Sequence, residues 1–145
     1  MSRGQQTISV ASILFVASLL THTAVARPPG SSVETLTETN ETVLGQEFAY
    51  PEGRARITAA LVTVPPGAVL PPHAHPVPLF GYVLQGELVV DYGSEGELTY
   101  RKGDALVEAI DWPHQGRNGG RGILKILVVY AGAEGISNAV PAELK

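Results

Sequence analysis

Residues 67–86 read GAVLPPHAHPVPLFGYVLQG, and they carry the main evidence for the fold. It places His73 and His75 two positions apart between prolines, and it continues into an apolar, aromatic run that stops at Gly86. Such a run, bounded by a turn, is typical of a β-strand. Side chains two positions apart on a strand face the same way, about 6.6 Å apart along the backbone. The two imidazoles can therefore lean together onto one metal ion.

Further short strands are expected on both sides of this stretch. The predicted strands cover residues 54–64, 80–84, 87–92, 97–101, 105–109 and 123–130, with glycine-rich or proline-rich turns between them. Strands at intervals of about 8–12 residues predict an all-β sandwich or barrel, and the lack of an internal repeat predicts one barrel. Both faces of 54–64 are largely apolar, so we expect this strand to be covered on both sides. Residues 131–145 are polar and predict little regular structure.

The composition fits one small folded domain. The 145 residues include 10 Lys and Arg, 14 Asp and Glu, 4 His and no Cys, which gives a net charge of −4. A hydrophobic share of 44% excludes a disordered tail. The negative charge argues against nucleic-acid binding, which depends on basic patches. Without cysteine the chain has no disulfides, thiolate metal ligands or cysteine nucleophiles.

The first 26 residues have the pattern of a secretory signal peptide. Arg3 precedes an apolar run at 8–20, and residues 24–26 (AVA) offer a cleavage site. The run is shorter than the roughly 20 residues that a membrane span needs. We therefore expect cleavage, export to the periplasm or the medium, and no stable membrane insertion; an uncleaved anchor or a buried helix is the alternative. The predicted segments after the signal peptide are an N-terminal arm with edge strands (27–53), a barrel (54–131) and a C-terminal tail (132–145).

Cleavage would remove His22 and leave His73, His75 and His114. A His-x-His pair alone is a weak metal signal, because histidines also occur on surfaces and in cores. His114 can supply a third nitrogen from a later strand. Three histidines without cysteine, and with open coordination positions, describe a catalytic site better than a closed structural one.

The glycines around these histidines resemble the two motifs of the cupin superfamily, G-x5-H-x-H-x3-E-x6-G and G-x5-P-x-G-x2-H-x3-N. The matching residues are Gly67, His73, His75 and Gly86 in the first motif, and Gly103, His114 and Asn118 in the second. The resemblance covers roughly residues 55–130. It implies a single cupin (jelly-roll-like) β-barrel of the small, exported, bacterial type, in which His73, His75 and His114 are metal ligands.

Three positions depart from the family pattern. Leu79 stands where the first motif has its glutamate, so the usual fourth ligand is missing. Ala109 and Asp111 replace the proline and the glycine of the second motif. These two changes affect a turn before His114, which we expect to tolerate them.

Glu108 is the candidate catalytic residue. Cupin strands at this place carry apolar, inward-facing residues at alternate positions, which here are Leu106 and Glu108. An inward glutamate is costly to ionise unless it lies near a cation, which a divalent ion on His114 would supply. We predict that Glu108 is a replacement fourth ligand or a general base beside the metal. The alternative is a rim glutamate bonded to Arg117, Arg121 or a backbone amide.

Four further residues are predicted to form the substrate pocket. Leu79 and Gly81 share the inward parity of the two paired histidines, so Leu79 would form an apolar wall and Gly81 would leave space for a ligand. Trp112 is expected at the mouth, with packing at the barrel rim as the alternative. Asn118 completes the predicted pocket, although its side chain is also suited to fixing a turn or orienting a histidine.

Two other pairs are expected near the surface. Arg117 and Arg121 could attract an anion, or they could simply be solvated charges. Phe80 and Tyr82 have outward parity and could pack against a second subunit in a homodimer, as cupins often pair.

A three-histidine site is suited to several reactions. Three neutral imidazoles leave a divalent ion its full charge and up to three open positions, and they suit Fe, Zn, Cu and Ni. The resemblance to three-histidine cupin dioxygenases implies one divalent ion per chain, with Fe(II) favoured and Mn, Zn, Ni or Cu possible. It also implies a dioxygenase-like oxidoreductase acting on a small anionic or chelating molecule. Zn or Mn would instead favour an isomerase, lyase or decarboxylase, and a cupin that binds metal or ligand without turnover is the third alternative.

Overall fold

The computed structural model describes residues 30–144. The predicted signal peptide and its cleavage site lie outside the described residues. Residues 30–33 belong to a separate N-terminal unit, and the fold described below is that of the unit that begins at Glu34. Within the described part of the chain, no helix is long and apolar enough to cross a membrane.

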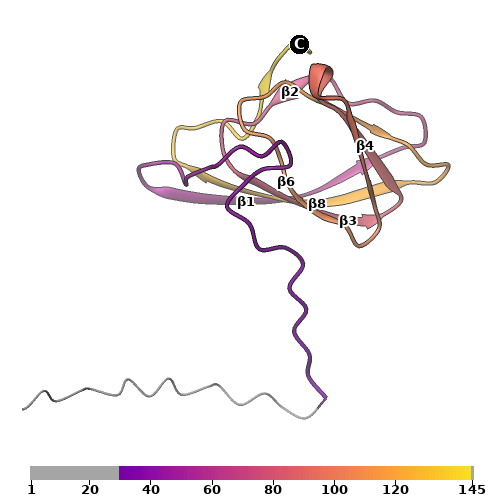
Figure 1. Ribbon diagram of the computed structural model, residues 1–145, viewed down its shortest axis with the longest axis horizontal. Helices are drawn as coiled ribbons and strands as arrows, with labels where there is room; N and C mark the ends of the chain where they lie inside the picture. Colours follow the sequence, from indigo (N-terminus) through magenta and orange to yellow (C-terminus); the bar gives the residue numbers. More distant parts are fainter. Residues whose placement is uncertain (1–29, 145) are drawn as a thin grey trace, which may run out of the picture. The chain divides into compact units, whose positions relative to one another are not determined.

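The unit is built almost entirely of antiparallel strands, which confirms the all-β prediction. The elements are β1 (Ala55–Val64), β2 (His73–Ala74), β3 (Leu79–Gln85), β4 (Glu87–Asp91), the 3-10 helix η1 (Gly93–Glu95), β5 (Glu97–Arg101), β6 (Ala105–Val107), β7 (Gln115–Asn118), β8 (Leu124–Ala133) and β9 (Val140–Pro141). They form a four-stranded sheet in the order β1-β8-β3-β6, a three-stranded sheet β5-β4-β7 and a two-stranded sheet β2-β9. Figure 1 shows β1, β8 and β3 running along one side of the barrel, with β4 on another.

The core fills the space between the two larger sheets. Alternate residues at the start of β3 and of β8 are buried there, as the alternation of a strand requires, whereas Leu88, Val89 and Val90 of β4 are all buried. Burying each such aliphatic side chain contributes about 1.5–3 kcal/mol to stability. The buried cluster consists of Val64, Leu79, Val83, Leu88, Val90, Tyr92, Ala109, Leu124, Ile126 and Val128.

β1 is not covered on both sides, so this prediction from its two apolar faces is wrong. The strand pairs with β8 and forms an edge of its sheet. Ile57 is 66% exposed and Leu61 is 57% exposed. An apolar pattern on two faces cannot distinguish a sandwiched strand from an edge strand with an apolar outer face. The outer face of this sheet comprises Ile57, Ala59, Leu61, Phe80, Tyr82, Leu127 and Val129, which the strand register places on one side.

The structure also contains pairing that the sequence pattern does not indicate. β7 has the sequence QGRN, which has no strand propensity, and it forms because Gln115 and Asn118 align with Asp91 and Leu88 of β4. Between residues 30 and 53, where edge strands were expected, the pairing is the isolated bridge between Glu41 and Glu47.

The C-terminal segment is more ordered than its polarity predicts. β8 continues to Ala133, and β9 pairs with β2, so that Pro141 lies opposite His73 and Val140 opposite Ala74. The segment predicted to be weakly structured therefore packs against the strand that carries the first histidine.

Gly86 is the turn residue whose substitution has the clearest steric consequence. Its φ of +83° is a left-handed conformation, and an added Cβ would lie 2.8 Å from the carbonyl oxygen of Ile123 and 3.0 Å from Cα of Leu124. We expect Gly86→Ala to lower the free energy of unfolding by about 2–5 kcal/mol, measured by urea denaturation. Gly103→Ala is the control, because Gly103 has a φ of +97° but no neighbour within 4 Å; a loss of about 1–2 kcal/mol is expected there. Equal losses in the two variants would contradict the steric argument.

Candidate metal centre

Backbone hydrogen bonds place His73 opposite His114, although the two residues are far apart in the sequence. The N–H of His73 donates to the carbonyl of His114 at 3.0 Å, and the N–H of His114 donates to the carbonyl of His73 at 2.9 Å. These bonds form an isolated antiparallel bridge between the two segments. The carbonyl of His75 accepts from the N–H of Asp111 at 2.9 Å, which extends the contact. The side chains of His73, His75 and His114 therefore start from two paired segments of backbone.

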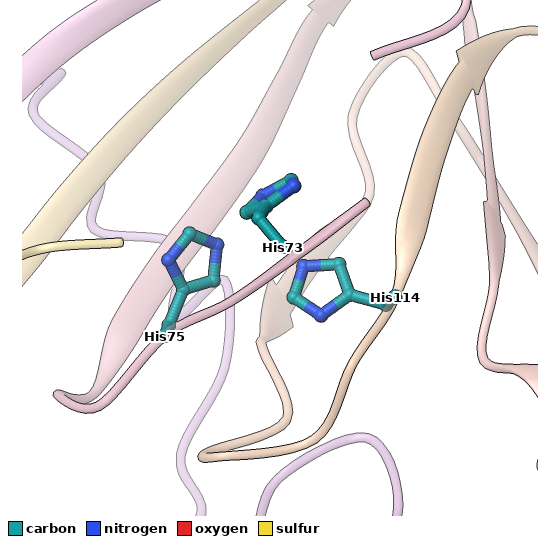
Figure 2. Close-up of side chains that lie close together, drawn as sticks. All are labelled: His73, His75 and His114. Carbon is teal, nitrogen blue, oxygen red and sulfur yellow. The ribbon is translucent and has the colours of Figure 1, made fainter. Parts of the chain in front are cut away.

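The three side chains converge, and we call His73, His75 and His114 the histidine cluster. Figure 2 shows the three rings gathered in one place, two from one segment and the third from another. Their ring centroids are 4.6–5.1 Å apart. One ring nitrogen of each lies within 4.8 Å of the others, so the cluster could hold a metal ion. Two ligands of one ion at bond lengths near 2.1 Å are at most about 4.2 Å apart, so small side-chain rotations would suffice.

Backbone carbonyls fix the tautomer of every histidine in the cluster. Because a carbonyl can only accept a hydrogen bond, each Nδ1 carries the hydrogen, and in the neutral form of the imidazole Nε2 then keeps its lone pair. Metal-binding histidines are commonly oriented in this way, so the donor set fits a metal ion. The carbonyl partners are Pro71 for His73 (2.9 Å), Asn138 for His75 (2.8 Å) and Trp112 for His114 (2.9 Å).

Burial keeps at least two of the imidazoles neutral at pH 7. Burial, together with the neighbouring histidines, lowers the pKa of His75 to about 4. Burial also lowers the pKa of His73. A neutral imidazole is the form that binds a metal, so protons do not compete for these two ligands near neutrality.

Glu108 lies inside the barrel beside the cluster. It is 5% exposed. Its Oε1 accepts hydrogen bonds from the hydroxyl of Tyr92 at 2.6 Å and from the N–H of Ala109 at 2.8 Å. Its Oε2 lies 3.8 Å from Nε2 of His114, which is too long for a hydrogen bond but close enough for both atoms to face one ion. Glu108 is therefore not a rim residue. Of the alternative partners predicted for it (Arg117, Arg121 or a backbone amide), a backbone amide is the one that bonds to it.

Tyr92 is a site residue that the sequence analysis missed. Its side chain is fully buried, and its ring centroid lies 5.7 Å from that of His114. Burial and the adjacent Glu108 carboxylate raise the pKa of Tyr92 above its ordinary value, so the hydroxyl stays protonated and donates. The signal for Tyr92 was its inward parity with Leu88 and Val90 on the preceding strand.

A cavity of about 80 Å³ adjoins the cluster and Glu108. Leu79 and Gly81 line it, as do aliphatic residues of β4 and β8 and the ring of Tyr130. The space at Gly81 is narrow, because an added Cβ would lie 3.0 Å from the Leu106 side chain. No lysine or arginine is among the described residues that line the cavity. A bound anion would therefore depend on the ion for its counter-charge.

Trp112 and Asn118, predicted to line the pocket, are not among the residues that line the cavity. The indole N–H of Trp112 donates to the carbonyl of Tyr92 at 3.0 Å, and the ring packs on the core. These contacts of Trp112 favour the alternative role as a packing residue. Arg117 also lies outside the cavity lining, paired with Glu97 at 3.1 Å.

Asn118 fixes a turn. Its amide group donates to the carbonyls of Val64 at 2.9 Å and Gly122 at 2.8 Å, and its Oδ1 accepts from the N–H of Gly120 at 2.9 Å. We expect Asn118→Ala to lower the free energy of unfolding by about 2–4 kcal/mol, because buried carbonyls lose their donors. The metal content of the folded variant should equal that of the wild type. Loss of metal without loss of stability would instead indicate that Asn118 acts at the metal centre.

The two changes in the second motif are accommodated in different ways. Asp111 has a φ of 51°, the one positive φ of a non-glycine residue in the described chain. Aspartate tolerates this left-handed conformation, which the motif's glycine adopts freely. Ala109 is fully buried and uses its N–H to bind Glu108. A proline at this position would have no N–H to donate.

Comparison with known proteins identifies the family. Residues 60–130 match the model of the cupin domain, and the barrel belongs to the cupin superfamily. No curated protein matches the sequence.

Several solved structures have the same fold. An oxalate decarboxylase of Lactobacillus farciminis, solved with formate, is 27% identical with a TM-score of 0.52, over 59% of this chain and 26% of that chain. The DMSP lyase DddQ of Ruegeria pomeroyi is 23% identical with a TM-score of 0.52, over 59% of this chain and 43% of that one. A Klebsiella pneumoniae protein with a double-stranded β-helix domain is 19% identical with a TM-score of 0.52, over 82% and 90%. The match thus spans about a quarter of the decarboxylase.

Proposed function

We propose that this cupin is a metal-dependent oxidoreductase of the dioxygenase type. It holds one divalent ion, with Fe(II) favoured, on Nε2 of His73, His75 and His114. The observation that carries the proposal is the set of three Nδ1 hydrogen bonds to backbone carbonyls, which leaves three lone pairs available to one ion. The substrate is a small molecule, because the adjoining cavity is about 80 Å³, and it is anionic or chelating, because with no lysine or arginine in the described lining the ion itself would bind it.

The ion and the surrounding side chains would have different roles in the reaction. An ion held by three neutral imidazoles offers open positions for a chelating substrate and for O₂. The aliphatic wall around Leu79 keeps water away from the substrate and strengthens electrostatic interactions there. Glu108 serves as a fourth ligand or as a general base beside the ion.

A non-redox lyase or decarboxylase is the second candidate. It is favoured by the buried Glu108 carboxylate, whose Oε2 faces the histidine cluster and could accept a proton. The 27% identity to an oxalate decarboxylase agrees with this candidate. Zn²⁺ or Mn²⁺ would then act as a Lewis acid that polarises a substrate oxygen.

Metal analysis after anaerobic purification of the untagged protein tests these candidates. Bound iron together with O₂ uptake on adding small chelating acids or diketones supports the dioxygenase. Bound zinc or manganese without O₂ uptake supports the lyase or decarboxylase. A site that neither retains nor takes up Fe²⁺, Mn²⁺ or Zn²⁺ overturns both proposals.

Export and pairing complete the proposal. The signal-like first 26 residues support export to the periplasm or the medium. A second copy packed against the outer face of the four-stranded sheet would cover its exposed apolar side chains, among them Ile57 and Leu61. We expect the wild type to sediment as a dimer and Leu61→Asp as a folded monomer. Sedimentation of the wild type as a monomer at all concentrations would contradict pairing.

A further inference from the structure

We propose that Tyr92 is a positioning residue for the metal centre. Together with the N–H of Ala109, its hydroxyl fixes the Glu108 carboxylate so that Oε2 faces the ion on the histidine cluster. Glu108 thereby replaces the carboxylate that the motif loses at Leu79. The inference rests on the proposed metal centre. It assigns the residues that orient Glu108, the only carboxylate among the described residues that line the cavity.

The two oxygens of Glu108 have different surroundings. Oε1 is held by two donors, the Tyr92 hydroxyl at 2.6 Å and the Ala109 N–H at 2.8 Å. Oε2 lies 3.8 Å from Nε2 of His114, beyond hydrogen-bond distance, and Nε2 is the ring nitrogen that His114 can offer to an ion while its Nδ1 donates to a carbonyl. The two donors thus set the carboxylate plane, and they leave Oε2 directed at the cluster.

The charge of this carboxylate needs a counter-charge within the barrel. Glu108 is 5% exposed, and no lysine or arginine is among the described residues lining the cavity beside it. A buried carboxylate without a cation is costly, and two hydrogen bonds to one oxygen leave the other unsatisfied. A divalent ion on the histidine cluster satisfies both requirements.

Ala109 connects two departures from the family motifs, its own replacement of proline and the replacement of glutamate by Leu79. A proline, as the family motif has here, could not donate to Glu108. The change to Ala109 therefore supplies the second donor, at the same site where the change to Leu79 removes a carboxylate. Both departures are explained by one relocated carboxylate.

Tyr92 is also linked to the histidine cluster through a second set of hydrogen bonds, which runs through Trp112. Its carbonyl accepts from the indole N–H of Trp112 at 3.0 Å, and the carbonyl of Trp112 accepts from Nδ1 of His114 at 2.9 Å. The side chain of Tyr92 thus orients Glu108, and its backbone orients His114 through Trp112. Because Phe removes only the hydroxyl, Tyr92→Phe separates the first route from the second.

Binding of Co²⁺ to the chelator-treated full chain tests the inference without a known substrate. We expect Glu108→Gln to weaken Co²⁺ binding about 10–100-fold and Tyr92→Phe about 10-fold, each with a changed visible spectrum of the bound ion. In the double variant, the loss should equal that of Glu108→Gln alone, because Tyr92 acts through Glu108. Tyr82→Phe on the outer face is the matched control, and its binding and spectrum should equal those of the wild type.

Several results would overturn the inference. One is a Tyr92→Phe variant with wild-type affinity and spectrum, even if its melting temperature falls, since a purely structural role would do that. Another is full additivity of the two losses. Should Tyr92→Phe not fold, an unchanged Co²⁺ spectrum in Glu108→Gln would refute the inference, since Glu108 would then not face the ion. If the wild type binds no Co²⁺, the proposed metal centre itself fails.

Discussion

His114→Ala is expected to abolish retention of a divalent ion, and His73→Ala should do the same. Each variant removes one of three nitrogen ligands, and the chain has no cysteine to replace it. After dialysis, metal content measured by atomic emission should fall from about one ion per chain to near zero. The stabilisation by metal should also vanish, because an ion that binds only the folded state adds about 2.7 kcal/mol at a hundred times its Kd.

The control for this prediction must separate metal loss from a packing defect. His114 is 2% exposed, so alanine also leaves a cavity. The comparison is therefore between metal-replete and chelated samples of each variant, with Arg117→Ala as an adjacent substitution outside the cluster. Wild-type metal content in His114→Ala, or the same rise in melting temperature on adding metal, would show that the ion does not bind at the cluster.

The motif spacing predicted the centre because it specifies turns as well as ligands. Gly86 has a φ of +83° with backbone close to where a Cβ would lie, so few other residues fit that turn. The turn sets where β4 begins, and β4 in turn pairs with the strand that follows His114. Spacing between glycines and histidines therefore encodes the strand register that brings the histidines together.

What the sequence could not predict depends on tertiary contacts. The carbonyl of Asn138, which orients His75, belongs to a polar tail whose order comes from pairing with β2. Backbone carbonyls have no residue-type signature, so no motif could indicate this contact. β1 was misjudged for the same reason, because exposure of Leu61 depends on the strand's place at the sheet edge. Tyr92 matched the inward parity, but nothing local showed that its hydroxyl would meet a carboxylate.

Glu108→Gln should separate the function of this residue from its part in folding. Glutamine can still accept from Tyr92 and Ala109 through its amide oxygen, while the amide nitrogen takes the place of Oε2 and removes the charge. We expect metal affinity to fall at least about ten-fold, or about 1.4 kcal/mol.

The metal-free Glu108→Gln variant should be no less stable than the metal-free wild type, because a buried charge without lysine or arginine in the described cavity lining destabilises the fold. Isothermal titration with Fe²⁺ under anaerobic conditions and urea denaturation in chelator measure the two quantities. Glu97→Gln is the matched control, since that carboxylate pairs with Arg117 outside the cavity lining. If Glu108→Gln instead lowers stability and leaves metal affinity unchanged, Glu108 holds the barrel together, and the centre depends on histidine alone.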